Sequence, residues 1–142
     1  MSRAPWYHWP IALAALLWYV AGAADYALTR LRVPAYLSQF SPDQVAYFQS
    51  MPTWVDAAWA VGVWVGLVGA VLLVMRMGIA VLPLAASCAA MVAATVWLLV
   101  LSDPPMAEVT GMLGVWIMVG VAAASLVIYI YARAMRVMGV LA

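Results

Sequence analysis

Charged residues are scarce in this sequence, and lysine is missing altogether. Only 8% of the residues are charged, and the six basic ones are all arginine. Soluble domains carry about 25% charged residues, so a chain that is also 70% hydrophobic falls outside their range. The net charge of +1 provides no basic surface for nucleic acid, which is therefore not expected as a partner. The composition indicates an integral membrane protein.

Cysteine and histidine each occur once, which limits the chemistry open to the chain. Cys88 lies in an apolar run, where it can form neither an intramolecular disulfide nor a cysteine-based metal cluster, and we expect it to pack as a small hydrophobic residue. His8 alone cannot supply two haem ligands, and it has no plausible partners for a Ser-His-Asp triad. We therefore predict no catalytic residues, no metal site and no enzymatic activity.

His8 stands among aromatic residues just before the first long apolar run. Trp6, Tyr7 and Trp9 surround it in the sequence, and aromatic side chains of this kind gather at membrane interfaces. We interpret His8 as an interfacial residue of this aromatic cluster. Axial ligation of a pigment or a metal by His8 is the alternative.

Long apolar runs divide the 142 residues into four membrane spans with little sequence left over. A helical span needs about 20 apolar residues, so the runs predict spans at about 9–28, 53–75, 79–101 and 110–131. The fold class that follows is an all-α, integral membrane four-helix bundle in a single domain, residues 1–142. Arg3, the first apolar run and the small residues 21–24 also resemble a secretory signal. The length of the run and Trp18 within it favour a first span instead.

The only long connection, between the first two spans, predicts a short amphipathic helix at about 42–50. Ser41 can cap its start, with Pro42 in the first helical position and Gln44 placed to complete a capping box. The apolar residues of this segment suit a helix lying at the membrane surface. We place it in the first outer loop.

Small residues recur at helical spacing in the second and third spans. Such residues let two helices approach closely in lipid, where a GxxxG pair is a common packing motif. The predicted helix-packing residues are Gly62, Gly66, Gly69, Ala86, Ala90 and Ala94.

The arginines divide unequally between the two ends of the predicted bundle. Four of them fall on the side of the termini and two, Arg30 and Arg32, on the side of the long loop. By the positive-inside rule, both termini are predicted to be cytoplasmic in a bacterial inner membrane. All five acidic residues then fall on the outer side.

Asp25 and Asp56 are the acidic residues predicted to lie within spans, each about one turn from the outer boundary. Charged groups within spans are costly and are usually paired or functional. One interpretation is an outer-face polar site for a cation or a polar solute; its members would be Asp25, Asp56, Arg30, Arg32, Trp18, Trp54 and Trp59. The alternative is that Arg30 and Arg32 pair with the two carboxylates and hold the long loop against the spans.

The first two spans and their loop resemble a family of small bacterial four-span proteins that automatic naming often labels sugar transporters. The shared positions include Leu17-Trp18, Asp25-Tyr26, residues 36–40, Pro42-Asp43-Gln44, Ala46-Tyr47-Phe48, Pro52-x-Trp54 and Gly62-Val63-Trp64. The resemblance implies the four-span fold and a bacterial inner membrane, and it assigns no binding residues. Members often carry Asn after the first-span Trp, where this chain has Tyr19.

Three functions are compatible with these features. We expect a non-enzymatic accessory or assembly subunit, which uses the small-residue faces to join a larger membrane complex or copies of itself. An oligomeric transporter of sugar-like solutes is the first alternative, and a pigment- or quinone-binding subunit of an energy-transducing complex is the second. No cofactor is predicted, although bound lipid is expected and a pigment or quinone is possible. The expected partners are membrane lipids and another membrane protein or a second copy of the chain.

Overall fold

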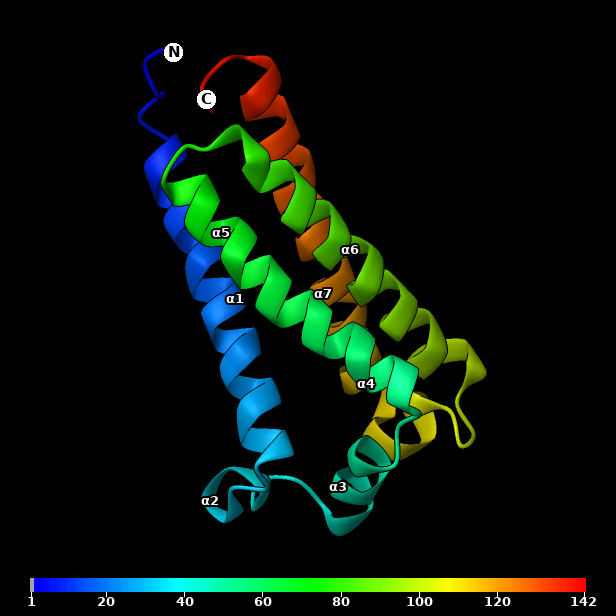
Figure 1. Cartoon of the computed structure of the whole chain (residues 1–142). Helices are drawn as coiled ribbons and strands as arrows, with labels where there is room; N and C mark the ends of the chain where they lie inside the picture. The colour runs from blue at the N-terminus through cyan, green and yellow to red at the C-terminus, as the bar shows by residue number, and fades with distance from the viewer. Residues whose placement is uncertain (1) are drawn as a thin grey trace.

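The computed structural model describes residues 2–142, and over these residues it is an all-α bundle without strands (Figure 1). Four of its helical segments are long and apolar enough to cross a membrane, which confirms the predicted fold class. These segments are α1 (His8–Arg30), α4–η1–α5 (Thr53–Ala60, Val61–Val65, Gly66–Val74), η2–α6–η3 (Gly78–Ala80, Val81–Val96, Trp97–Leu101) and α7 (Met106–Val137). Both termini lie at one end of the bundle, the terminal end, and the long connection lies at the other, the loop end.

The fourth helix, α7, is longer than the predicted span at 110–131. It covers 32 residues, and its first and last turns lie outside the apolar run. The first turn contains Glu108 and the last turn contains Arg136. Gly111 interrupts it with φ 73°, a left-handed value that glycine adopts without steric cost. The count of apolar residues therefore locates the membrane span but underestimates the length of the helix.

Two short helices, α2 (Pro34–Leu37) and α3 (Pro42–Gln49), form the connection at the loop end. The predicted capping box at the start of α3 is present: the Gln44 backbone N–H donates to Ser41 Oγ at 3.2 Å, and the Ser41 backbone N–H donates to Gln44 Oε1 at 3.2 Å. The sequence did not predict α2, which begins with Pro34 in its first position.

The glycines of the second span lie against neighbouring helices, where a larger residue would collide. A Cβ atom on Gly62 would meet the Met91 side chain of α6, and one on Gly69 would meet Leu84 of α6 at 2.7 Å. Gly66 lies where α1 and α6 both approach, against the Tyr19 ring and Ser87. The three glycines thus form the close-packed face of α4–η1–α5.

The alanines predicted to pack in the third span do not form a continuous interface. Ala94 is buried and Ala90 is partly buried, but Ala86 is exposed. Residues four apart on a helix drift by about 40° per step, so a row of three turns away from one neighbour. The buried face of α6 follows mixed spacings of three and four instead: Leu84, Ser87, Cys88, Met91, Ala94 and Thr95.

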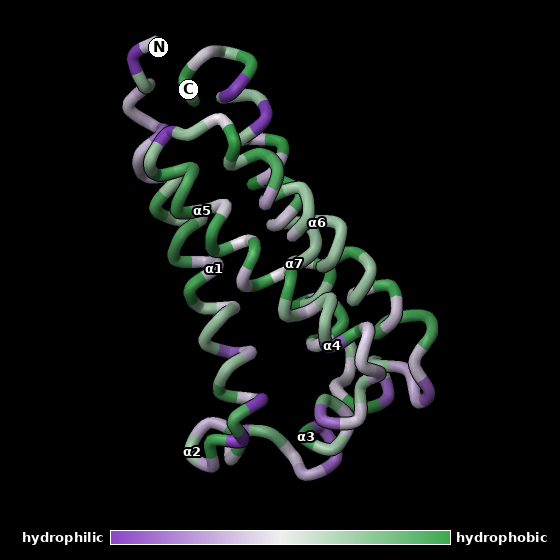
Figure 2. The backbone as a smooth tube through the Cα atoms, in the orientation of Figure 1, coloured by the Kyte–Doolittle hydropathy of each residue, from purple (hydrophilic) through white to green (hydrophobic). Residues whose placement is uncertain are grey.

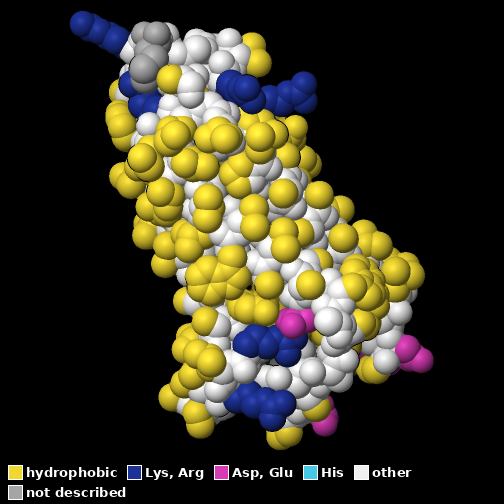
Figure 3. All heavy atoms as spheres, viewed as in Figure 1, with side chains coloured by type: hydrophobic (Ala, Val, Ile, Leu, Met, Phe, Trp, Pro, Cys, Tyr) yellow, Lys and Arg dark blue, Asp and Glu magenta, His cyan; other side chains and the backbone are white. Residues whose placement is uncertain are grey.

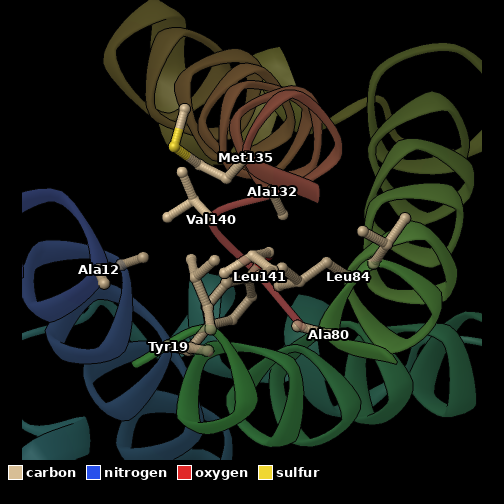
Figure 4. Packing of buried hydrophobic residues seen from close by; sticks show 12 residues of the cluster. Ala12, Tyr19, Ala80, Leu84, Ala132, Met135, Val140 and Leu141 are labelled. Carbon is tan, nitrogen blue, oxygen red and sulfur yellow. The ribbon is translucent and has the colours of Figure 1, made fainter. Parts of the chain in front are cut away.

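The terminal end of the bundle is closed by a hydrophobic core (Figure 4). Val140 and Leu141, which follow α7, are buried among residues of the surrounding helices such as Ala12 and Leu84. Arg76 holds this segment in place, because its Nε donates to the Val140 carbonyl at 3.1 Å. The helices are therefore fastened together at this end.

Charge and hydropathy follow the long axis of the bundle. Figure 2 shows apolar residues along the helices and hydrophilic ones concentrated toward both ends. In the view of Figure 3, arginine side chains are visible toward both ends, whereas acidic side chains are visible only toward the loop end. All five acids belong to the loop end by position: Asp25, Asp43, Asp56, Asp103 and Glu108.

Candidate ligand-binding cleft

A cleft of about 560 Å³ lies between α1 and α7 in the loop-end half of the bundle. At the terminal end these two helices are joined, because the Tyr131 hydroxyl of α7 lies 2.9 Å from Nδ1 of His8 on α1. Toward the loop end the helices separate, and α4, η1 and α6 form the floor between them. The cleft therefore lies among the helical segments that are long and apolar enough to cross a membrane.

The walls of the cleft are mainly apolar and aromatic. The polar side chains in its lining are few, and Asp25 is the only charged residue among them. Deep in the cleft lie Val63, Met91 and Val121, which pack together in one hydrophobic cluster. The polar lining residues are Tyr19, Asp25, Thr29, Tyr36, Gln44, Thr110 and Ser125.

Helix α3 closes the loop end of the cleft through hydrogen bonds to three parts of the bundle. The Gln49 amide donates to the Thr29 carbonyl of α1 at 2.9 Å, and the Gln44 amide donates to the Val109 carbonyl of α7 at 3.4 Å. The Tyr47 hydroxyl donates to Ser102 Oγ, also at 2.9 Å. The predicted surface helix is thus a cover that spans from α1 to α7.

Asp25 lies on the cleft wall and accepts a hydrogen bond from the Tyr36 hydroxyl of α2. The Tyr36 ring packs edge-on against Phe40, with ring centroids 5.6 Å apart. Burial raises the pKa of Tyr36, and the hydrogen bond to Asp25 and its negative charge add to the increase. Tyr36 therefore stays a neutral donor to the carboxylate.

Asp56 belongs to a different contact. Arg30, at the end of α1, donates from Nε to Asp56 Oδ1 at 2.7 Å and also forms an ion pair with it through a second nitrogen. The side chains are 24% and 30% exposed, so the pair is largely shielded from solvent. It joins the two ends of the connection that contains α2 and α3. Asp56 does not line the cleft, so the two carboxylates do not share one site.

The remaining members of the predicted outer-face site are also divided. Trp18 and Trp59 line the cleft, and the Trp59 ring packs edge-on against Tyr26 with centroids 4.9 Å apart. Trp54 is 52% exposed and lies outside the cleft lining. Arg32 is exposed in the turn after α1, with φ 52°, and makes no ion pair within residues 2–142. Arg30 therefore pairs with a carboxylate as the alternative interpretation predicts, and Arg32 does not.

His8 is fully buried in the structure. It lies among aromatic rings, as the sequence predicts, and its position at a membrane interface stays a prediction. Its ring stacks on Tyr131 at a centroid distance of 5.9 Å and meets Trp9 edge-on at 5.7 Å. Nε2 lies 3.3 Å from the Leu73 carbonyl, which it can reach as a donor, while Nδ1 faces the Tyr131 hydroxyl. Both ring nitrogens are thus occupied, which leaves none directed at a pigment or metal.

The sequence did not identify a buried polar cluster in the middle of the bundle. Ser87 Oγ donates to the Gly62 carbonyl at 2.5 Å and lies 3.4 Å from the hydroxyl oxygen of Tyr19. Gly62 belongs to the π-helical turn η1, where a wider hydrogen-bond pattern disturbs the regular pairing of carbonyls. A π-helical turn has no clear sequence signature. The only sequence signal for this cluster is the presence of Tyr19 and Ser87 within apolar spans.

Tyr36→Phe is expected to make the protein less sensitive to alkaline unfolding. The ordinary pKa of tyrosine is 10.0, and burial and Asp25 raise that of Tyr36. Above this pH the unfolded chain releases a proton that the folded chain keeps, so stability present at lower pH is lost as pH rises toward the folded pKa. The midpoint of thermal unfolding between about pH 9 and about pH 11 should fall less steeply in the variant. Burial also raises the pKa of Tyr47, so part of the pH dependence should remain in the variant. Identical slopes would contradict the role of Tyr36.

No protein-family model, curated protein or solved structure matches this chain. The resemblance to small bacterial four-span proteins therefore stays a prediction. The function has to be argued from the geometry of the cleft and of the residues around it.

Proposed function

We propose that this chain is a non-enzymatic accessory protein of a bacterial inner membrane, which binds a lipid-like or other lipophilic molecule in the cleft between α1 and α7. The observation that supports this proposal is the cleft itself: it measures about 560 Å³, lies among helices long and apolar enough to cross a membrane, and has walls that are mainly apolar. Small-molecule sites are usually concave, apolar and of 300 to about 1,000 Å³, with a few polar groups that fix orientation. Asp25, Tyr36 and Gln44 are such groups near the loop end.

A sugar-like solute fits the cleft less well than a lipophilic one. Each hydroxyl of a sugar needs a hydrogen-bond partner, and an unpaired buried polar group costs free energy. Most of the lining supplies apolar side chains, such as Val63, Met91 and Val121, instead of such partners. Transport of polar solutes thus has less support than lipid-like binding, and the predicted quinone or pigment belongs to the favoured class.

The orientation and the partner remain part of the proposal. Four arginines near the terminal end favour its placement in the cytoplasm, which would put the cleft in the leaflet opposite the cytoplasm. Helix α7 exposes a long apolar face, including Leu113, Trp116 and Val127, which lipid or a neighbouring membrane protein can cover. Co-purification in mild detergent would identify such a neighbour.

The binding proposal can be tested by photolabelling in proteoliposomes. A phospholipid with a diazirine on its acyl chain should label Met91, which lines the cleft and keeps 8% of its surface exposed. Because Met91 is otherwise buried, lipid of the surrounding bilayer has little access to it, so its labelling reports an occupied cleft. Absence of label on Met91, with label on residues outside the cleft alone, would overturn the proposal.

A matched pair of variants gives the expected size of the effect. Val121→Trp places a larger side chain in the cleft, beside Met91, and should reduce labelling of Met91 by about fivefold or more, which corresponds to roughly 1 kcal/mol in the free energy of binding. Val119→Trp adds the same side chain on an exposed part of α7 outside the lining and should leave the labelling unchanged. Equal labelling in the two variants would contradict binding within the cleft.

A further inference from the structure

We propose that the preferred occupant of the cleft is a lipophilic organic cation, a molecule with a delocalised or substituted cationic centre surrounded by apolar groups. This inference rests on the proposed function and adds the charge of the ligand to it. It comes from two independent features of the lining: a single carboxylate, and several aromatic rings on the same walls.

The carboxylate of Asp25 has no basic partner in the part of the chain that the structure describes. Tyr36 donates a hydrogen bond to one of its oxygens, whereas Arg30, on the same helix, is engaged by Asp56. The cleft lining contains no arginine or histidine. Because a charge at membrane depth is costly without a partner, a cationic ligand would stabilise Asp25 where a neutral or anionic one would not.

The aromatic residues of the lining suit the same class of ligand. An organic cation is attracted to the face of an aromatic ring, and this attraction grows when water is excluded. Cages of aromatic rings bind quaternary ammonium groups in this way. The aromatic lining residues come from α1, the connection and α4: Trp18, Tyr19, Tyr36, Phe40, Phe48 and Trp59.

The two carboxylates of the loop-end half, Asp25 and Asp56, have different surroundings and therefore different roles. Asp56 is neutralised by an arginine and lies outside the lining, so it holds the structure. Asp25 is held by a neutral donor, which leaves its negative charge uncompensated on the wall. The chain therefore places one uncompensated charge at the cleft, and its sign selects the ligand.

Tetraphenylphosphonium and tetraphenylborate provide a direct test, because the two ions have nearly the same size and shape and opposite charge. Binding to the purified full chain in nanodiscs of neutral lipid can be measured by equilibrium dialysis, with the uptake of each ion by protein-free nanodiscs subtracted, because the dipole potential of the bilayer favours the anion. We expect the phosphonium to bind at least about tenfold more tightly than the borate. In Asp25→Asn this preference should disappear, whereas Asp103→Asn, which removes an exposed acid outside the cleft, should keep it.

A second measurement uses the unaltered protein, so it does not depend on how a variant folds. At equal bound amounts, tetraphenylphosphonium should reduce the photolabelling of Met91 by the neutral lipid, while tetraphenylborate should not. Equal binding of the two ions, or an unchanged preference in Asp25→Asn, would overturn the cation inference. Photolabelling of Met91 by neutral lipid would then still support the proposed function, so the two failures can be told apart.

Discussion

Replacement of Gly69 by alanine is expected to lower the free energy of unfolding by about 2 kcal/mol, the range found when a packed interior is overfilled. The added Cβ would lie 2.7 Å from Leu84 Cγ and 3.1 Å from the Leu84 backbone nitrogen. Leu84 is fully buried, so its side chain has little space in which to move away. Helices α5 and α6 would have to separate. The effect can be measured by unfolding the purified protein with sodium dodecyl sulfate from mixed micelles.

Two other glycines provide the controls for this prediction. Gly120→Ala adds the same methyl group where no heavy atom lies within 4 Å, and it should be neutral or slightly stabilising. Gly62→Ala should fall between the two, because the Met91 side chain that it meets is flexible and can adopt another rotamer. Equal stability of the Gly69 and Gly120 variants would contradict the close packing of α5 on α6.

Asp56→Asn is expected to destabilise the protein by about 2 kcal/mol, a value between those of exposed and fully buried ion pairs. The substitution leaves Arg30 without its carboxylate in a site where solvent reaches less than a third of either side chain. The contact joins the ends of the connection that carries α2 and α3, so this segment should also open more often. Trypsin cleavage after Arg30 and Arg32 should therefore become faster, which limited proteolysis followed by mass spectrometry can measure.

A double-mutant cycle separates the ion pair from other effects of these substitutions. Arg30→Gln with Asp56→Asn should cost less than the sum of the single changes, by about 1 kcal/mol or more. Arg32→Gln removes an exposed arginine that forms no ion pair in the described chain, and it should change the stability by less than about 0.5 kcal/mol. Additive effects of the Arg30 and Asp56 substitutions would argue against the contact.

The sequence predicted the fold class because the apolar runs and the helix cap each have a strong local physical cause. Apolar runs long enough to cross a membrane have few alternatives to helices, since every backbone polar group must be satisfied within the segment. The capping box at Ser41 and Gln44 is equally local, and it is present in the structure. Gly69 lay in a recognisable row of small residues. Ala86 lay in a similar row but is exposed, because small residues permit close packing without requiring it.

The candidate site was predicted less well, because its members come together only in three dimensions. Asp25 and Asp56 are equivalent in sequence, each about a turn inside a span, and nothing local says which one Arg30 reaches. The sequence does not pair Tyr36 with Asp25, since the position of Tyr36 depends on α2, a helix of four residues. The cleft itself depends on the angle between α1 and α7, which side-chain packing at the terminal end determines and the sequence does not report.

The two halves of the bundle differ, because one is filled with side chains and the other contains the cleft. Val140 and Leu141 fill the space between the helices at one end, while the cleft occupies the other half. On the proposed function, a molecule in the leaflet on the loop side would enter the cleft by sideways diffusion, whereas one in the other leaflet would have to flip first. The proposed function therefore predicts that the protein takes its ligand from one leaflet only.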